Sequence, residues 1–193
     1  RSHIESAVKT AEYAAALTAQ LLNYSRKQTH NQVVECINLN EIVDDVVVLM
    51  GAVLLSGLDI ELNLSKSLPQ IEVSRTHLQQ IVMNLIINAA EAIDDPVNGK
   101  IVVHTGKCHA SSWKRSCGFS GFEEMPLGDY VFLQISDNGK GMDENTLVKI
   151  FDPFFSTKPK GRGLGLSTIK DIVRENNGQI AVKSVPDVGT TFR

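Results

Sequence analysis

Hydrophobic and small residues recur every three or four positions near the start of the chain, at 4, 8, 11, 15, 18, 22 and 25. This spacing is typical of a single apolar seam on a long helix, and its many alanines allow a partner helix to approach closely. The seam favours a dimerising helical arm, although a helix folded back onto the domain's own core has the same pattern. Because 26–32 is polar like a linker, we expect an incomplete helical region over 1–32 and a globular domain over 33–193.

The first part of the globular region changes between helical and strand patterns. A capping pattern begins at Asn38 and an apolar face follows it, so we expect a helix over 38–56. Alternating apolar residues predict a strand over 59–64. Ser74 is a suitable N-cap for a second helix, which we expect over 75–94.

The later part of the chain contains further strand patterns. Short runs of apolar residues between turn signals predict strands at 100–105, 129–136, 179–185 and from Gly189 onward. We expect a loop over 106–128, which has no periodicity, and a helix over 164–177. This order of elements favours an α+β fold, a two-layer sandwich with helices on one face of a mixed sheet, preceded by one long helix.

Composition excludes several classes of protein. Hydrophobic residues make up 42% of the 193 residues and charged residues 21%, so the chain is able to form a core and is not disordered. The net charge of −3 gives no overall basic field, so we expect neither a nucleic-acid partner nor direct membrane contact. The longest apolar run, Val46–Leu55, is too short to span a bilayer. Three scattered cysteines favour a reducing compartment such as the cytoplasm.

Polar residues interrupt the apolar stretch at the end of the second predicted helix. Asn84 and Asn88 are one turn apart, and His77, Gln80 and Glu91 extend the same stripe. A buried amide without a partner costs roughly 1–3 kcal/mol, so two amides facing one way favour a ligand or an ion. Amide oxygen suits Mg²⁺ that is already bound to phosphates. A hydrogen bond between helices in the core is the competing explanation.

A carboxylate followed by two glycines comes directly after a predicted strand, in Asp137-Asn138-Gly139-Lys140-Gly141. The carboxylate at the strand's end is a good acceptor for an amine such as that of adenine, and the glycines let backbone approach a ligand. A tight surface turn has the same composition. A calcium loop fits poorly, because its sixth position should be Gly and is Met142 here.

Two further segments favour contact with an anion. Phenylalanines at 151, 154 and 155 favour an anchored lid, and Lys158 and Arg162 beside them favour phosphate contact. A hydrophobic loop next to a solvated charge run is the alternative. Glycines at 161, 163 and 165 then open a predicted helix, whose free N–H groups and dipole attract anions. Their spacing matches neither the Walker A loop nor the Rossmann fingerprint.

The order of these segments is more specific than any one of them. An Asn-x₃-Asn helix, Asp-x-Gly-x-Gly, a Phe-rich segment, Gly-x-Gly-x-Gly and Gly189-Thr190-Thr191-Phe192 follow one another. This set resembles the N, F and three glycine boxes of the ATP-binding domain of sensor histidine kinases, within the ATPase group of gyrase, Hsp90 and MutL. The resemblance covers nearly the whole chain and is nearest to nitrogen-regulator-like or hybrid kinases. It implies a Bergerat-type fold, with 4–26 similar to the second dimerisation helix.

The resemblance implies a role for individual residues. Asn88 would bind Mg²⁺, with Asn84 beside it, and Asp137 would accept the adenine amine, with Thr190 helping through a water. Lys158 and Arg162 would contact the phosphates of ATP. The remaining ATP-binding positions that it implies are small or apolar: Gly139, Gly141, Met142, Gly163, Leu164, Gly165 and Leu166.

The resemblance also bears on the type of activity. Gyrase-like ATPases carry a water-activating Glu where this chain has Asn84, so a protein-histidine kinase is favoured over a switching ATPase. A docking module with a decayed nucleotide site is the third hypothesis, but such a module should have broken boxes. The phosphoacceptor histidine and its base are expected outside this chain, which therefore has no catalytic residue of its own. Many relatives carry a Tyr that packs on adenine where this chain has Ala92.

Cofactors and partners follow from the same resemblance. It implies ATP and Mg²⁺, a homodimer through the dimerisation helices, and the receiver domain of a response regulator. The chain is expected to be a fragment of a longer cytoplasmic protein, with or without anchorage of that parent in the bacterial inner membrane.

Overall fold

The computed structural model describes residues 33–51, 55, 57–113, 119–120, 126–158 and 163–193. The helical arm and linker expected over 1–32 lie outside the described residues, as does Arg162.

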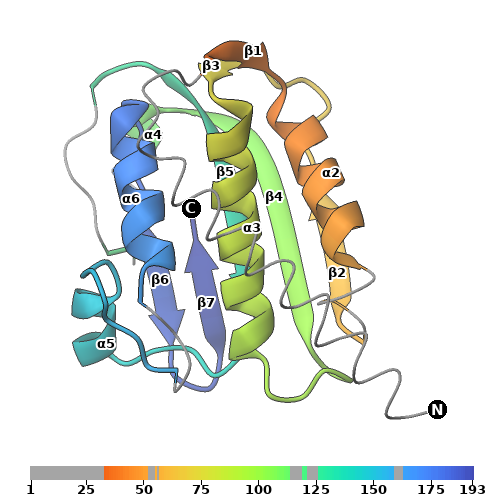
Figure 1. Ribbon diagram of the computed structural model, residues 1–193, viewed down its shortest axis with the longest axis vertical. Coiled ribbons are helices and arrows are strands. Elements are labelled where there is room, and N and C mark those ends of the chain that lie inside the picture. Colours follow the sequence, from red (N-terminus) through yellow and green to blue (C-terminus); the bar gives the residue numbers. More distant parts are fainter. Residues whose placement is uncertain (1–32, 52–54, 56, 114–118, 121–125, 159–162) are drawn as a thin grey trace.

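A five-stranded mixed sheet forms one layer of the described region (Figure 1). Its strands, in spatial order, are β2 (Asp59–Asn63), β4 (Lys100–His109), β5 (Asp129–Asp137), β7 (Gly189–Phe192) and β6 (Val182–Val185). The first pair is parallel and the other neighbouring pairs are antiparallel. A separate antiparallel pair joins β1 (Glu35–Ile37) to β3 (Ile71–Val73).

Helices form the second layer, on one face of this sheet. Figure 1 shows α2 (Leu39–Gly51), α3 (Arg75–Ala92) and α6 (Gly165–Glu175) side by side across it. The central helix α3 contacts both of the others as well as β4, β5 and β7. Short helices α4 (Ala110–Trp113) and α5 (Glu144–Lys149) complete the described elements. The predicted two-layer α+β sandwich is confirmed.

The core lies between the two layers. Its fully buried aliphatic side chains come from the inner faces of the helices and strands: Ile42, Val43, Val82, Ile86, Ile101, Val103, Ile135, Ile169, Ile172 and Val182. Burial of each such side chain contributes about 1.5–3 kcal/mol. The buried Thr105 hydroxyl donates to Asn40 Oδ1 (2.7 Å) and accepts from the Ser65 N–H (3.1 Å), so its burial leaves no unpaired polar group.

Several predicted boundaries are wrong. The strand expected over 100–105 continues to His109, so the loop expected over 106–128 is wrong at its start. The strand is longer than predicted because it pairs with β5 along almost its whole length, in a register that continues without a break to His109 opposite Asp129. Helix α2 is described as far as Gly51, and positions 52–54 and 56 of the predicted helix lie outside the described residues. Strand β6 begins at Val182 rather than 179.

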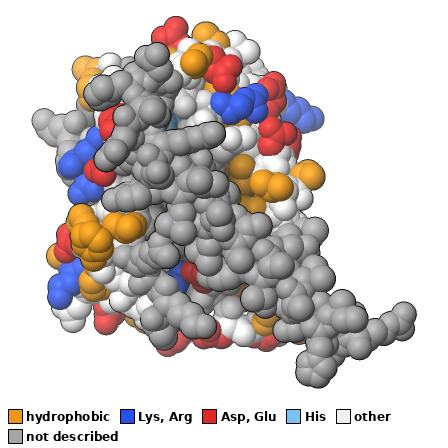
Figure 2. Space-filling view, viewed as in Figure 1, with side chains coloured by type: hydrophobic (Ala, Val, Ile, Leu, Met, Phe, Trp, Pro, Cys, Tyr) orange, Lys and Arg blue, Asp and Glu red, His pale blue; other side chains and the backbone are white. Residues whose placement is uncertain are grey.

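Arg75 connects the start of α3 to its neighbours. Its guanidinium lies 3.2 Å from Asp45 of α2, 3.8 Å from Glu35 of β1 and 4.0 Å from Glu41. Basic and acidic side chains accordingly gather at the upper right of Figure 2, where these elements meet. Ser74 occupies the N-cap position as expected, but its side chain makes no capping hydrogen bond. Among the described residues, none of the helices combines the length and apolarity needed to cross a bilayer.

Candidate functional site

Asp137 ends strand β5, where its carboxylate is held by two backbone groups. Oδ1 accepts hydrogen bonds from the N–H of Gly139 (2.9 Å) and the N–H of Thr190 (3.3 Å), which is the register partner of Asp137 on β7. Burial raises the pKa of this carboxyl above its ordinary value, opposed by both hydrogen bonds and by the positive charge of Lys158. No hydrogen bond from the described residues reaches Oδ2. One fixed acceptor oxygen is therefore available to a ligand.

The glycines after Asp137 are required by the protein's own packing. A Cβ on Gly139 would collide with the carbonyl of Ala92 at the end of α3. Gly141 has a φ of +63°, and a Cβ there would collide with the carbonyl of Val185. The intervening Lys140 N–H donates to Ala92 O (2.9 Å). This turn is thus packed tightly between α3 and the end of β6, so its glycines are needed for the fold as well as for the approach of a ligand.

The two asparagines of α3 lie one turn apart, as the sequence predicts. Asn84 is buried at 6% exposure, and Asn88 is half-buried. The Oδ1 atom of Asn88 lies 3.5 Å from the Lys158 ammonium, so this oxygen already faces a cation. An amide oxygen that already faces positive charge is a suitable ligand for Mg²⁺ that is held jointly with phosphates.

Lys158 crosses from the Phe-rich segment to α3. Its ammonium forms an ion pair and hydrogen bond with Glu91, one turn beyond Asn88. The sequence indicated that Glu91 shares the asparagine stripe, but it gave no sign of this partner. A lysine 67 residues away is placed beside the helix only by the fold.

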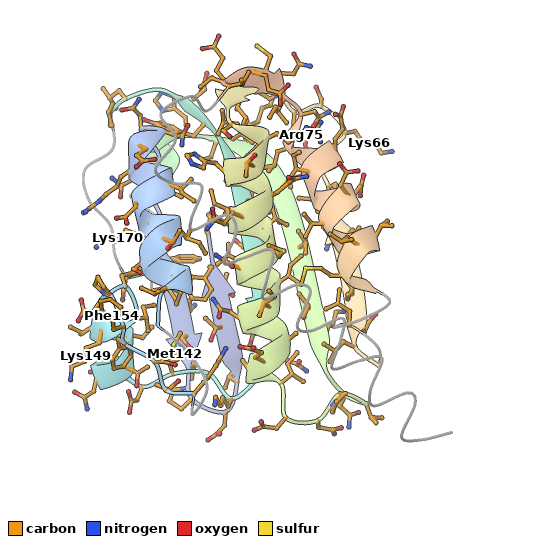
Figure 3. All side chains as sticks on the ribbon, viewed as in Figure 1. Lys66, Arg75, Met142, Lys149, Phe154 and Lys170 are labelled. Atoms are coloured by element: carbon orange, nitrogen blue, oxygen red, sulfur yellow. The ribbon has the colours of Figure 1, made fainter. Side chains whose placement is uncertain are left out.

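The Phe-rich segment is closed at its base by the backbone. The Phe154 N–H donates to Gly163 O (2.9 Å), and both residues have positive φ, +68° and +65°. Phe151 and Phe155 pack against the core as predicted anchors. The same expectation is wrong for Phe154, which is 77% exposed and projects outward beside α5 (Figure 3).

The start of α6 faces this closed segment. Leu164 is the N-cap, and its carbonyl accepts from Ser167 Oγ (3.1 Å). Unlike the other glycines of the site, Gly165 would carry a Cβ that meets no described atom within 4 Å. Leu166 and Met142, both predicted ATP contacts, are partly buried against the core.

Thr190 links the site to the edge of the sheet. Its backbone holds Asp137, while its Oγ1 lies 2.8 Å from Ser184 Oγ on β6. Sequence reasoning missed Ser184, since its place opposite Thr190 follows from the strand register. This bond orients the Thr190 hydroxyl.

The site therefore combines a partly buried acceptor carboxylate with an amide and an ammonium, between α3, the ends of β5 and β7, and the start of α6. The carboxylate can accept a hydrogen bond from a nucleobase, and the ammonium and the amide suit phosphates and a metal ion. This arrangement is that of a nucleotide-binding α/β sandwich. Residues 73–193 match the family described as histidine kinase-, DNA gyrase B- and HSP90-like ATPase, and the chain belongs to this family.

Sensor kinases are among the curated relatives. The sensor kinase CckA of Brucella abortus is 31% identical over 187 residues, covering 96% of this chain and 19% of that protein. The signal transduction histidine-protein kinase AtoS of Escherichia coli is 32% identical over 193 residues, covering all of this chain and 28% of that protein. The chain thus spans less than a third of the length of these relatives.

Solved structures include the same kind of domain. The catalytic domain of histidine kinase ThkA is 27% identical with a TM-score of 0.65, over 83% of this chain and 92% of that domain. Histidine kinase ThkA in complex with the response regulator protein TrrA is 25% identical with a TM-score of 0.62, over 95% of this chain and 47% of that one. The described fold is that of a histidine kinase catalytic domain.

Proposed function

We propose that this chain is the ATP-binding catalytic core of a sensor histidine kinase. It transfers the γ-phosphate of ATP to a histidine outside this chain, from which the phosphate passes to an aspartate of a response regulator. Support comes from the family match and from relatives named as histidine kinases. The histidine and its base would be supplied by the longer parent protein.

The observation that carries this proposal is how the two carboxylate oxygens of Asp137 are hydrogen-bonded. Its Oδ1 is used by two backbone N–H groups, and Oδ2 is left for an outside donor such as the exocyclic amine of adenine. A charge-assisted hydrogen bond of this kind is worth about 1.5–3 kcal/mol. Thr190, fixed by Ser184, stands next to the same carboxylate and is assigned to the adenine end.

The phosphate end is assigned to the opposite side of the site. Asn88, with Asn84 beneath it, would hold Mg²⁺, which neutralises phosphate charge when bound. Lys158 would contact the phosphates, joined by Arg162. The predicted small and apolar positions retain their proposed roles along the nucleotide: Gly139, Gly141, Met142, Gly163, Leu164, Gly165 and Leu166.

Transfer is favoured over hydrolysis by the residue at position 84. Asn84 is an amide and is not able to take a proton from water, whereas a glutamate would be. The competing function, a switching ATPase, requires that proton transfer. Phosphoryl transfer needs mainly positioning and neutralisation of charge, which the site's amide and ammonium groups supply.

The assembly of the parent protein is part of the proposal. Residues 1–32 would be the second dimerisation helix and linker, forming a homodimer, and 33–193 the catalytic domain. The receiver domain of a response regulator is the partner, which is supported by the ThkA–TrrA complex. We place the domain in the cytoplasm and assign Mg²⁺ as the metal.

Calorimetric titration of ATP into this chain, with Mg²⁺ or with EDTA, tests the proposal. Asp137→Asn is the informative variant, because its amide oxygen can replace Oδ1 while its NH₂ presents a donor where Oδ2 was. We expect Mg²⁺-dependent binding that is about 10- to 100-fold weaker in the variant. Absence of ATP binding in the folded wild-type chain would refute the nucleotide assignment. Steady ATP hydrolysis by this chain alone would support the switching ATPase.

A further inference from the structure

Glu91 is an acidic residue at a site that should attract anions. It lies on α3 three residues after Asn88, on the side from which Asn88 meets Lys158. An isolated carboxylate in this position would repel a triphosphate. Its pairing with Lys158 changes that expectation, because the pair brings no net charge to the site.

Lys158 is held at several points. Its backbone N–H donates to Ser156 Oγ (3.1 Å), and its ammonium contacts both Glu91 and Asn88 Oδ1. The Lys158 and Glu91 side chains are 29% and 32% exposed, so neither is freely solvated. An ammonium group has three N–H donors, which leaves a third for another acceptor.

Holding this side chain has a physical value. A lysine side chain has a flexible four-carbon stem and loses much rotamer freedom when its ammonium is immobilised. If Glu91 already fixes the ammonium, a phosphate that binds it does not have to order the side chain again. The contact with Asn88 places the held ammonium next to the amide oxygen assigned to the metal.

We propose that Glu91 is a positioning residue that holds the Lys158 ammonium beside Asn88, ready to contact the terminal phosphates of a nucleoside triphosphate. This inference rests on the proposed function. Glu91 then has a role in recognising the triphosphate and none in recognising the adenine ring. This role also separates Glu91 from Asp137, which acts at the other end of the nucleotide.

The test compares ligands of different phosphate content in calorimetric titrations with Mg²⁺. The ligands are adenosine and a non-hydrolysable ATP analogue, and the variants are Glu91→Gln, Lys158→Ala and their combination. We expect Glu91→Gln to weaken analogue binding about fivefold, the upper effect of a partly exposed ion pair, with adenosine affinity unchanged. In the Lys158→Ala background the same change should have no such effect, because Glu91 acts through Lys158.

Two controls separate positioning from charge and from folding. Glu72→Gln, in the two-stranded sheet, removes the same charge elsewhere and should leave both affinities unchanged. The reversed pair Glu91→Lys with Lys158→Glu retains an ion pair in the fold. It should unfold like the wild type but bind the analogue weakly, since a carboxylate now faces the phosphates.

The outcomes distinguish this inference from the proposed function. Wild-type binding with unchanged or tighter analogue affinity in Glu91→Gln would refute the positioning role and leave the proposed function intact. An equal loss for adenosine and the analogue would also refute it, by indicating general damage to the site. If the folded wild type binds neither ligand, both proposals are wrong.

Discussion

Alanine at Gly141 is expected to destabilise the domain, whereas alanine at Gly165 is not. At Gly141 the φ of +63° costs an L-residue about 1–2 kcal/mol. The new Cβ would also lie well under 3.0 Å from the carbonyl of Val185, and overpacking of this kind costs about 1–3 kcal/mol. The two contributions together predict a loss of about 2–5 kcal/mol in the free energy of unfolding.

Gly165 is the matched control because it is also a motif glycine but meets no described atom within 4 Å. Position 165 is the first residue of α6, where alanine is a better helix former than glycine. We therefore expect Gly165→Ala to leave the free energy of unfolding unchanged or to raise it by up to about 1 kcal/mol. If a phosphate approaches this helix start as proposed, Gly165→Ala should nevertheless weaken ATP binding. The pair thus separates a glycine required by the fold from one required by the ligand.

Urea unfolding followed by circular dichroism measures the first effect, and calorimetric titration of ATP measures the second. The comparison uses transition midpoints at an unchanged slope, so that the denatured states remain comparable. The steric reasoning would be refuted if Gly141→Ala unfolded at the wild-type urea concentration. It would equally be refuted if Gly165→Ala lost as much stability as Gly141→Ala.

Three further predictions concern other parts of the domain. Arg75→Ala should lower the free energy of unfolding by about 0.5–1 kcal/mol in low salt and by less in high salt, because its ion pairs are exposed; Lys66→Ala, on the same end of the molecule in Figure 3, is the neutral control in urea unfolding. Thr105→Val should cost about 1–3 kcal/mol by leaving the Asn40 oxygen unpaired, and an unchanged urea midpoint would contradict the reported hydrogen bond. ATP affinity should fall as pH drops through the raised pKa of Asp137, since protonation removes the acceptor charge. The stability that this residue contributes depends on pH in the opposite direction: it is fully present below the ordinary pKa of 3.8 and is lost as pH rises through the raised pKa of the folded state. The free energy of unfolding of the wild type should therefore increase relative to that of Asp137→Asn as pH falls, which urea unfolding at several pH values measures.

The parts of the fold that the sequence predicts are those with their own periodicity. Helix α3 has a long apolar face, so its position was predicted within two residues of its observed end at Ala92. Strands β1 and β3 have three residues each and exist because they pair with each other, which no local pattern reveals. Gly106 illustrates the same limit, since it indicates a loop in sequence but lies in β4 with the Phe132 ring against it.

The site follows the same division. Asp137 and Asn88 could be proposed as site residues because their motifs are continuous in sequence and lie on elements with clear patterns. The ion pair of Glu91 with Lys158 depends on the path of the Phe-rich segment after α5, and the bond between Ser184 and Thr190 depends on strand register. Sequence order therefore proposes candidate residues for the site, while the contacts among them require the tertiary structure.

The backbone hydrogen bond between Phe154 and Gly163 has a consequence for how this protein can evolve. It ties together the two ends of a short segment, so the number of residues between them can change without moving α6 or the strands. Loop closure becomes more costly by only about 0.6 kcal/mol for each doubling of loop length. The stretch between Lys158 and Gly163 is therefore the part that can change in length, whereas Phe155, which packs against the core, and Lys158, which contacts Glu91 and Asn88, are held by those contacts.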